Sequence, residues 1–158
     1  MPVQRTYNPN AEAMAKLIQA DLQRVGIKVT IQNSLEWSVF LRRLALGEHQ
    51  AVLLGWSADH PDPDNFLSPL LSCASSAFGN NRTFWCNEEF DQIIQQSLET
   101  TNVLQRKAYY AKALQIVADE LPLLPIAHAK RFQARRTNIE GQLLNAFGGI
   151  DFYKVSKH

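Results

Sequence analysis

The stretch from Ala51 to Phe66, AVLLGWSADHPDPDNF, constrains the fold of this chain more than any other segment. A short apolar run is followed by Gly55 and Trp56, then by Asp59 and a turn rich in proline and aspartate. Apolar runs of this length between Gly and Pro are typical of buried strands in an α/β sheet. Ligands of open α/β sheets bind beyond the carboxyl ends of the strands, where Trp56 and Asp59 are expected. An aromatic ring beside a single carboxylate suits a cationic or amine-bearing ligand.

The residues before this run predict a strand–helix–strand unit. A helix over residues 10–26 has apolar residues at helical spacing, and residues 27–31 then alternate between apolar and polar as in a strand. A second helix over residues 34–47 leads into the strand at residues 51–56. Short connections make the two strands parallel, with a right-handed crossover. The expected caps and ends of the two helices are Asn10, Gly26, Ser34 and Gly47.

The second half of the chain predicts further helices and an irregular tail, all within a single domain over residues 1–158. A short helix is expected over residues 66–71, followed by a loop without helical or strand periodicity. Asn87 and Asn102 are the expected N-caps of two more helices, the longer of which runs to about Glu120. This longer helix has Tyr110, Leu114, Val117 and Leu121 on one side. An extended LPLLPIA segment follows, and the remainder predicts strand and loop.

The two cysteines, Cys73 and Cys86, both lie in the Ser-, Asn- and Gly-rich segment SCASSAFGNNRTFWC. An even pair across such a loop favours a disulfide and an oxidising compartment. Closing a loop of this length stabilises the fold by about 3 kcal/mol in chain-entropy estimates. Two unrelated reduced thiols are the first alternative. A zinc site that adds His60 is the second, although it lacks an obvious fourth ligand.

Composition and motifs exclude several function classes. A formal net charge of +1 gives no electrostatic reason to expect nucleic acid or an anionic membrane as a partner. No apolar run approaches the ~20 residues that span a bilayer. No activated Ser or Cys arrangement is visible, and the acidic turn lacks the glycine and distal glutamate of an EF-hand, so we expect neither an enzyme nor a metal or cofactor site.

Two alternatives to a ligand-binding module stay open on the residues alone. The first is a metal-dependent hydrolase that uses Asp59, Asp62 and Asp64, although Asp62 and Asp64, flanked by prolines, fit turn-forming and capping duty better. The second is a general polyanion-interaction domain. Its basic run is made of Lys130, Arg131, Arg135 and Arg136, which also fits a charged strand edge.

Several stretches together resemble family 5 extracytoplasmic solute-binding proteins, the dipeptide- and oligopeptide-binding family that serves ABC importers. They are MPVQRTYNPNAEAMAKLIQADLQRVGIKV, the Glu36–Trp37 pair, GEHQAVLLGWSADHPDPDNF, SPLLSCASS, FWCNEEFDQII and ADELPLLPIAH. The resemblance is strongest to the dipeptide-binding branch and to its Sap-type relatives, which are linked to antimicrobial-peptide uptake.

The resemblance implies an α/β fold: part of the C-terminal lobe of a bilobed, type II periplasmic-binding-protein-like fold, with a mixed sheet flanked by helices. It also implies that Met1 is an internal residue of a longer periplasmic protein. That protein would be a monomer that binds peptides and delivers them to the membrane permease subunits of an ABC importer. By the same resemblance, Asp59 pairs with the α-ammonium group of a bound peptide and Arg5 contacts its carboxylate. Ala58, His60 and Pro61 replace the small glycine-containing turn of many dipeptide binders.

Overall fold

The structure is a computed structural model in which the described residues form two compact units, Met1–Trp56 and Ser57–His158. We describe each unit by itself. None of the described helices is long and apolar enough to cross a membrane. The single domain expected over residues 1–158 stays a prediction. The residues that the structure describes are 8–32, 35–128, 130, 132–141, 144–145, 147, 149, 151–153 and 155–158.

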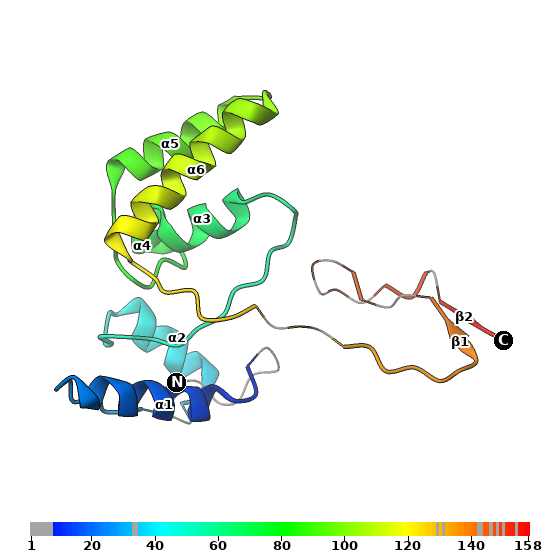
Figure 1. Ribbon diagram of the computed structural model, residues 1–158. Coiled ribbons are helices and arrows are strands. Elements are labelled where there is room, and N and C mark those ends of the chain that lie inside the picture. The colour runs from blue at the N-terminus through cyan, green and yellow to red at the C-terminus, as the bar shows by residue number, and fades with distance from the viewer. Residues whose placement is uncertain are drawn as a thin grey trace. The chain divides into compact units, whose positions relative to one another are not determined.

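The first unit contains two helices, α1 (Ala11–Arg24) and α2 (Trp37–Ala45) (Figure 1). Gly26 ends α1 as predicted: its φ of 86° lies in the left-handed region, and the N–H of Ile27 reaches back to the carbonyl of Leu22 at 2.9 Å. The other end differs, because Asn10 occupies the N-cap position of α1 but its side chain accepts no capping hydrogen bond. Ser34, the predicted cap of α2, lies outside the described residues.

The predicted strands at residues 27–31 and 51–56 are wrong, and with them the parallel strand–helix–strand unit. Neither segment belongs to a strand of the described chain, although both are free of helix. A strand exists only where a neighbouring segment supplies ladder hydrogen bonds, and apolar alternation alone does not supply that neighbour. The Val29 carbonyl accepts instead from the side-chain amide of Gln19, at 2.8 Å.

The apolar side of α1 is not buried within its unit. No residue of α1 is buried, and Leu17 remains 67% exposed. In contrast, α2 buries Phe40 and Leu44, and the ring of Trp37 stacks on Phe40 with 5.5 Å between centroids. The core of the first unit therefore centres on α2.

The second unit contains four helices (Figure 1), and three of them contribute buried residues to one apolar core. Phe90 is fully buried at its centre, and the indole of Trp85 meets it edge-on at 5.2 Å. Tyr110 and Ala113 contribute from the longest helix, which lies along its predecessor. The helices are α3 (Asp64–Leu71), α4 (Cys73–Phe78), α5 (Glu88–Glu99) and α6 (Val103–Glu120).

The predicted caps of α5 and α6 are confirmed. Asn87 accepts from the N–H of Phe90 at 2.9 Å, and Asn102 accepts from the N–H groups of Leu104 and Gln105. These side chains satisfy backbone donors that no helical carbonyl reaches. The acidic residues Glu88, Glu89 and Asp91 also occupy the first turn of α5, where the helix dipole favours negative charge.

The tail holds a short antiparallel pair, β1 (Ile139–Glu140) and β2 (Ser156–Lys157), in which Ile139 lies opposite Lys157. Within the basic run, Arg135 donates to the carbonyl of Gly141 at 2.8 Å, while Arg131 lies outside the described residues.

Candidate functional site

Asp59 lies in the exposed turn that leads into α3. Its backbone N–H donates to Oδ1 of Asn65 at 2.9 Å. Its side chain is exposed, and the carboxylate forms no hydrogen bond or ion pair with any residue that the structure describes. The turn thus has a fixed backbone and an acceptor group that faces solvent.

Asn65 holds this turn through both ends of its side-chain amide. Because Oδ1 accepts from Asp59, the amide nitrogen faces Nε2 of His60, at 3.1 Å. An NH2 group only donates, so Nε2 of His60 is the acceptor in this contact. Asn65 therefore connects the start of the turn to the first turn of α3.

Asp62 has a different environment from Asp59, because its carboxylate is fully engaged. Oδ2 lies 2.7 Å from Nη2 of Arg106, and Oδ1 accepts from the hydroxyl of Tyr110 at 2.7 Å. Oδ1 also accepts from the N–H of Asp64 at 3.0 Å, which is the predicted turn-forming role. Arg106 itself lies over the Tyr110 ring, 5.7 Å from its centroid. Asp62 thus ties the turn to α6.

The titration of this cluster follows from its contacts. Burial raises the pKa of the Asp62 carboxyl, but hydrogen bonds from Tyr110 and the Asp64 N–H, with the charge of Arg106, outweigh it. The pKa of Asp62 therefore lies below its ordinary value of 3.8. Burial and the hydrogen bond to Asp62 raise the pKa of the Tyr110 hydroxyl above 10.0. Both shifts favour an ionised Asp62 and a neutral Tyr110 at neutral pH.

The three aspartates of the turn do not act as one metal-binding group. Asp64 accepts a short hydrogen bond from Ser68 one turn along α3. Asp62 is committed to Tyr110 and Arg106, which leaves only the Asp59 carboxylate open. Among the residues described, no three His, Cys, Asp or Glu side chains form a group that could hold a metal ion. This arrangement favours turn formation over the hydrolase alternative.

The other predicted site residues receive no placement beside Asp59. Trp56 is half-buried and is the last residue of the first unit, whereas Asp59 belongs to the second. Arg5 lies outside the described residues. A pocket of about 290 Å³ lies along α2 but is lined by none of these residues. Its lining residues are Val39, Arg42, Arg43, Leu46 and Glu48.

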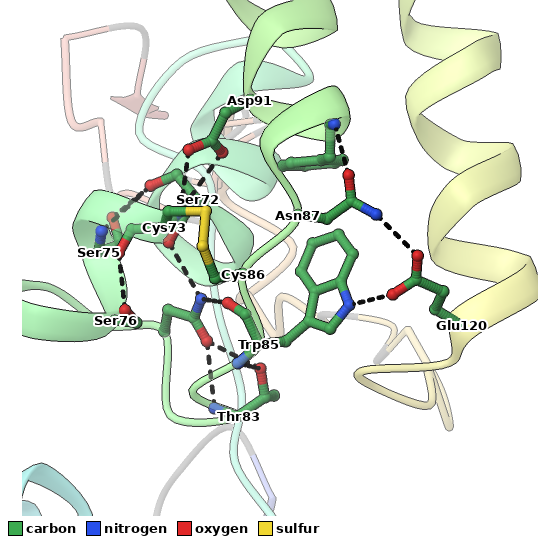
Figure 2. The surroundings of a disulfide bond; sticks show 12 residues. Ser72, Cys73, Ser75, Ser76, Thr83, Trp85, Cys86, Asn87, Asp91 and Glu120 are labelled. Atoms are coloured by element: carbon green, nitrogen blue, oxygen red, sulfur yellow. Dashed lines mark hydrogen bonds between the residues drawn. A yellow bond between two sulfur atoms is a disulfide. The ribbon is translucent and has the colours of Figure 1, made fainter.

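The predicted disulfide between Cys73 and Cys86 is present (Figure 2). The expectation of a loop without helix is wrong for part of this segment, since Cys73 begins α4. Ser72 caps that helix by accepting from the N–H of Ser75, and the Asp91 carboxylate accepts from the N–H of Cys73 at 3.1 Å. A helix of six residues is too short to show an apolar period in the sequence, so the pattern of apolar residues does not predict it. Its start is instead set by the cap at Ser72.

Asn81 closes the loop from inside and is fully buried. Its NH2 group donates to the carbonyls of Ser72 and Trp85, at 3.1 and 2.8 Å. Its oxygen accepts from the N–H and the hydroxyl of Thr83. A buried amide with every donor and acceptor paired stabilises one loop conformation over others.

Glu120, in the last turn of α6, joins this loop to the helix core. Its two carboxylate oxygens accept from the indole N–H of Trp85 at 2.6 Å and the amide of Asn87 at 2.7 Å. Figure 2 shows both side chains turned toward the carboxylate. The Asp59 turn and the disulfide loop are therefore both attached to α6, through separate residues.

Sequence reasoning missed the residues that hold the turn: Asn65, Arg106 and Tyr110. Tyr110 was expected only as part of an apolar helix face. The available signal was the four-residue spacing of Arg106 and Tyr110, which places both on one face of a helix. Nothing in the spacing connects that face to an aspartate 48 residues away from Tyr110.

The sequence of the chain is similar to those of known proteins. Residues 2–78 match the model for bacterial extracellular solute-binding proteins, family 5 middle. The chain is 42% identical over 156 residues to the dipeptide-binding protein of Escherichia coli strain K12, covering 99% of this chain and 29% of that protein. It is 40% identical to the peptide transport periplasmic protein SapA of Salmonella typhimurium, covering 97% of this chain and 28% of that protein.

A solved structure gives the same result for the fold. The dipeptide-binding protein from Pseudoalteromonas sp. SM9913, in complex with Met-Leu, is 47% identical and superposes with a TM-score of 0.85. The match covers 99% of this chain and 31% of that protein. The predicted fold class, a part of an α/β lobe, is confirmed by this likeness, and the chain spans about three-tenths of the length of the relatives it matches. The chain therefore belongs to family 5 of the bacterial extracellular solute-binding proteins.

Proposed function

We propose that this chain is part of the periplasmic peptide-binding component of an ABC importer, and that Asp59 receives the α-ammonium group of the bound peptide. The observation that carries the proposal is the exposed Asp59 carboxylate, which has no partner among the described residues while its backbone is fixed by Asn65. The names of the relatives support the ligand class, since the Escherichia coli protein binds dipeptides and the Pseudoalteromonas structure holds Met-Leu.

In this proposal the protein binds and releases peptide without chemical change. Trp56 contributes to the wall of the pocket, and Arg5 contacts the peptide carboxylate. Closure of two lobes shields the ammonium–carboxylate pair from water, which strengthens a charge-assisted hydrogen bond. The loaded protein then delivers its peptide to membrane permease subunits as a monomer. Uptake of cationic antimicrobial peptides is a narrower form of the same function, suggested by the likeness to SapA.

The test measures binding of Met-Leu and N-acetyl-Met-Leu to the full-length protein by isothermal titration calorimetry. Losing one partner of a desolvated charge pair costs about 2 kcal/mol or more, which is about 30-fold in affinity. Asp59→Asn should therefore weaken Met-Leu binding by about 30-fold or more, with little change in thermal stability. N-acetyl-Met-Leu, which has no ammonium group, should bind the wild type weakly.

Glu89→Gln is the matched control, because Glu89 is an exposed carboxylate in the first turn of α5. This variant should bind Met-Leu as the wild type does. Wild-type affinity in the Asp59→Asn variant would show that Asp59 is only a turn residue.

A further inference from the structure

The side chain of Asp62 attaches the turn that carries Asp59 to α6. Asp62 follows Asp59 by three residues, and its side chain is 23% exposed. Its partner Tyr110 is 7% exposed and belongs to the apolar core of the second unit. A contact from a surface turn to a core residue restricts the turn more than a contact between two exposed groups does.

The two aspartates also differ in charge compensation. Arg106 lies 2.7 Å from the Asp62 carboxylate and neutralises its charge locally, whereas no cation among the described residues pairs with Asp59. Without Arg106, the two carboxylates would repel one another across a short turn. The salt bridge to Arg106 therefore reduces the repulsion between the two carboxylates, and only that of Asp59 is left without a partner among the described residues.

We propose that Asp62 is a positioning residue for the peptide-binding site: by bonding Tyr110 and Arg106 on α6, it fixes the turn that presents Asp59 to the peptide ammonium group. Asn65 adds a second, local contact to the same turn through the N–H of Asp59. The inference rests on the proposed function, because it assigns Asp62 a role that acts through Asp59.

The experiment uses the full-length protein and the ratio of its affinities for Met-Leu and N-acetyl-Met-Leu. Asp62→Asn and Tyr110→Phe should each lower this ratio about fivefold to tenfold, because a loosened turn presents Asp59 poorly. In the Asp59→Asn background the same two changes should have no further effect on the ratio. A purely structural role would lower the melting temperature but leave the ratio unchanged in both backgrounds.

Arg106→Gln separates positioning from simple charge. If the cluster acted only through its electric field, removing a cation would strengthen binding of the ammonium group. Positioning predicts the opposite, a weaker preference for Met-Leu. Lys107→Gln is the matched control, since Lys107 is the next residue of α6 and is exposed. It should change the ratio less than twofold.

The outcomes distinguish this inference from the proposed function. If the wild type binds Met-Leu and Asp59→Asn abolishes the preference, but Asp62→Asn, Tyr110→Phe and Arg106→Gln leave it intact, the positioning role is overturned alone. If Arg106→Gln strengthens Met-Leu binding, the cluster acts through charge and the positioning role is also overturned. If the wild type binds neither ligand, the proposed function fails and the positioning role fails with it.

Discussion

Neighbouring residues of one chemical type have separate roles in this chain. Asp59, Asp62 and Asp64 lie within six residues, yet one is exposed and open, one is bonded to α6 and one begins α3. Their surroundings, not their type, assign these roles. The sequence singles out Asp59 by its place after the apolar run and beside Trp56, and the resemblance implies its role; the flanking prolines indicate turn formation for Asp62. Sequence reasoning could not find Tyr110 and Arg106 as partners, because contacts between distant segments leave no mark on local spacing.

The lowered pKa of Asp62 predicts a pH-dependent contribution to stability. A folded-state pKa below 3.8 means that the ionised carboxylate stabilises the folded protein at pH values above 3.8. This contribution is lost as pH falls through the lower, folded-state value. At pH 7, Asp62→Asn should destabilise the protein by about 1 kcal/mol, a typical value for a partly exposed charged hydrogen bond. Urea unfolding at pH 7 and at pH 3 should show a smaller difference between wild type and variant at pH 3.

Tyr110→Phe provides the comparison for this prediction. It removes one of the hydrogen bonds that lower the pKa of Asp62, so the stability of this variant should depend less on pH in the acidic range. A destabilisation by Asp62→Asn that stays constant from pH 7 to pH 3 would contradict the prediction.

At the scale of helices and strands, caps and ends were predicted better than strands. The helices capped by Asn87 and Asn102 begin where the sequence places them, because a capping side chain acts on the next three residues. The strands at residues 27–31 and 51–56 fail because strand formation needs a partner segment. The predicted apolar side of the helix capped by Asn102 is only partly buried: Tyr110 is buried, but Leu114 and Leu121 are 52% and 63% exposed, and Leu121 follows the last residue of α6.

Two asparagines at helix starts offer a matched pair for testing capping. Asn102→Ala should destabilise α6 by about 1 kcal/mol, because the Asn102 side chain accepts from two backbone N–H groups. Asn10→Ala should have a much smaller effect on α1, since the Asn10 side chain makes no capping hydrogen bond. Hydrogen-exchange mass spectrometry of the full-length protein should show faster exchange at the start of α6 in the first variant only. Equal effects of the two changes on their helices would argue against this account of the caps.

At the scale of the whole chain, each unit leaves large apolar side chains exposed, such as Leu17 in the first and Leu104 in the second. The chain spans about three-tenths of the length of the relatives it matches. The resemblance predicts the family from motifs spread over nearly the whole chain, whereas local sequence patterns predict only single helices and strands. A family likeness draws on many positions at once, so it tolerates local errors such as the missing strands.

The disulfide is the covalent contribution to the stability of the second unit. It joins residues 13 apart in sequence, and a loop of this length predicts about 3 kcal/mol of stabilisation. The variant with both Cys73→Ser and Cys86→Ser should therefore unfold at a lower urea concentration than the oxidised wild type. Reducing agent should lower the stability of the wild type to that of the variant and leave the variant unchanged. A wild type that is insensitive to reduction would contradict the expected contribution.

The amide of Asn81 has a consequence for the chemical ageing of the protein. Spontaneous deamidation would replace its NH2 group by a negative oxygen, facing the carbonyl oxygens of Ser72 and Trp85 that it now bonds. Because Asn81 is fully buried, the folded protein protects it from deamidation. A molecule deamidated at Asn81 while unfolded would bring the new carboxylate oxygen against the carbonyl oxygens of Ser72 and Trp85 when it refolds, and these three oxygens would repel one another. Loss of folded protein through deamidation at Asn81 should therefore be greater in samples that have been unfolded and refolded than in samples kept folded.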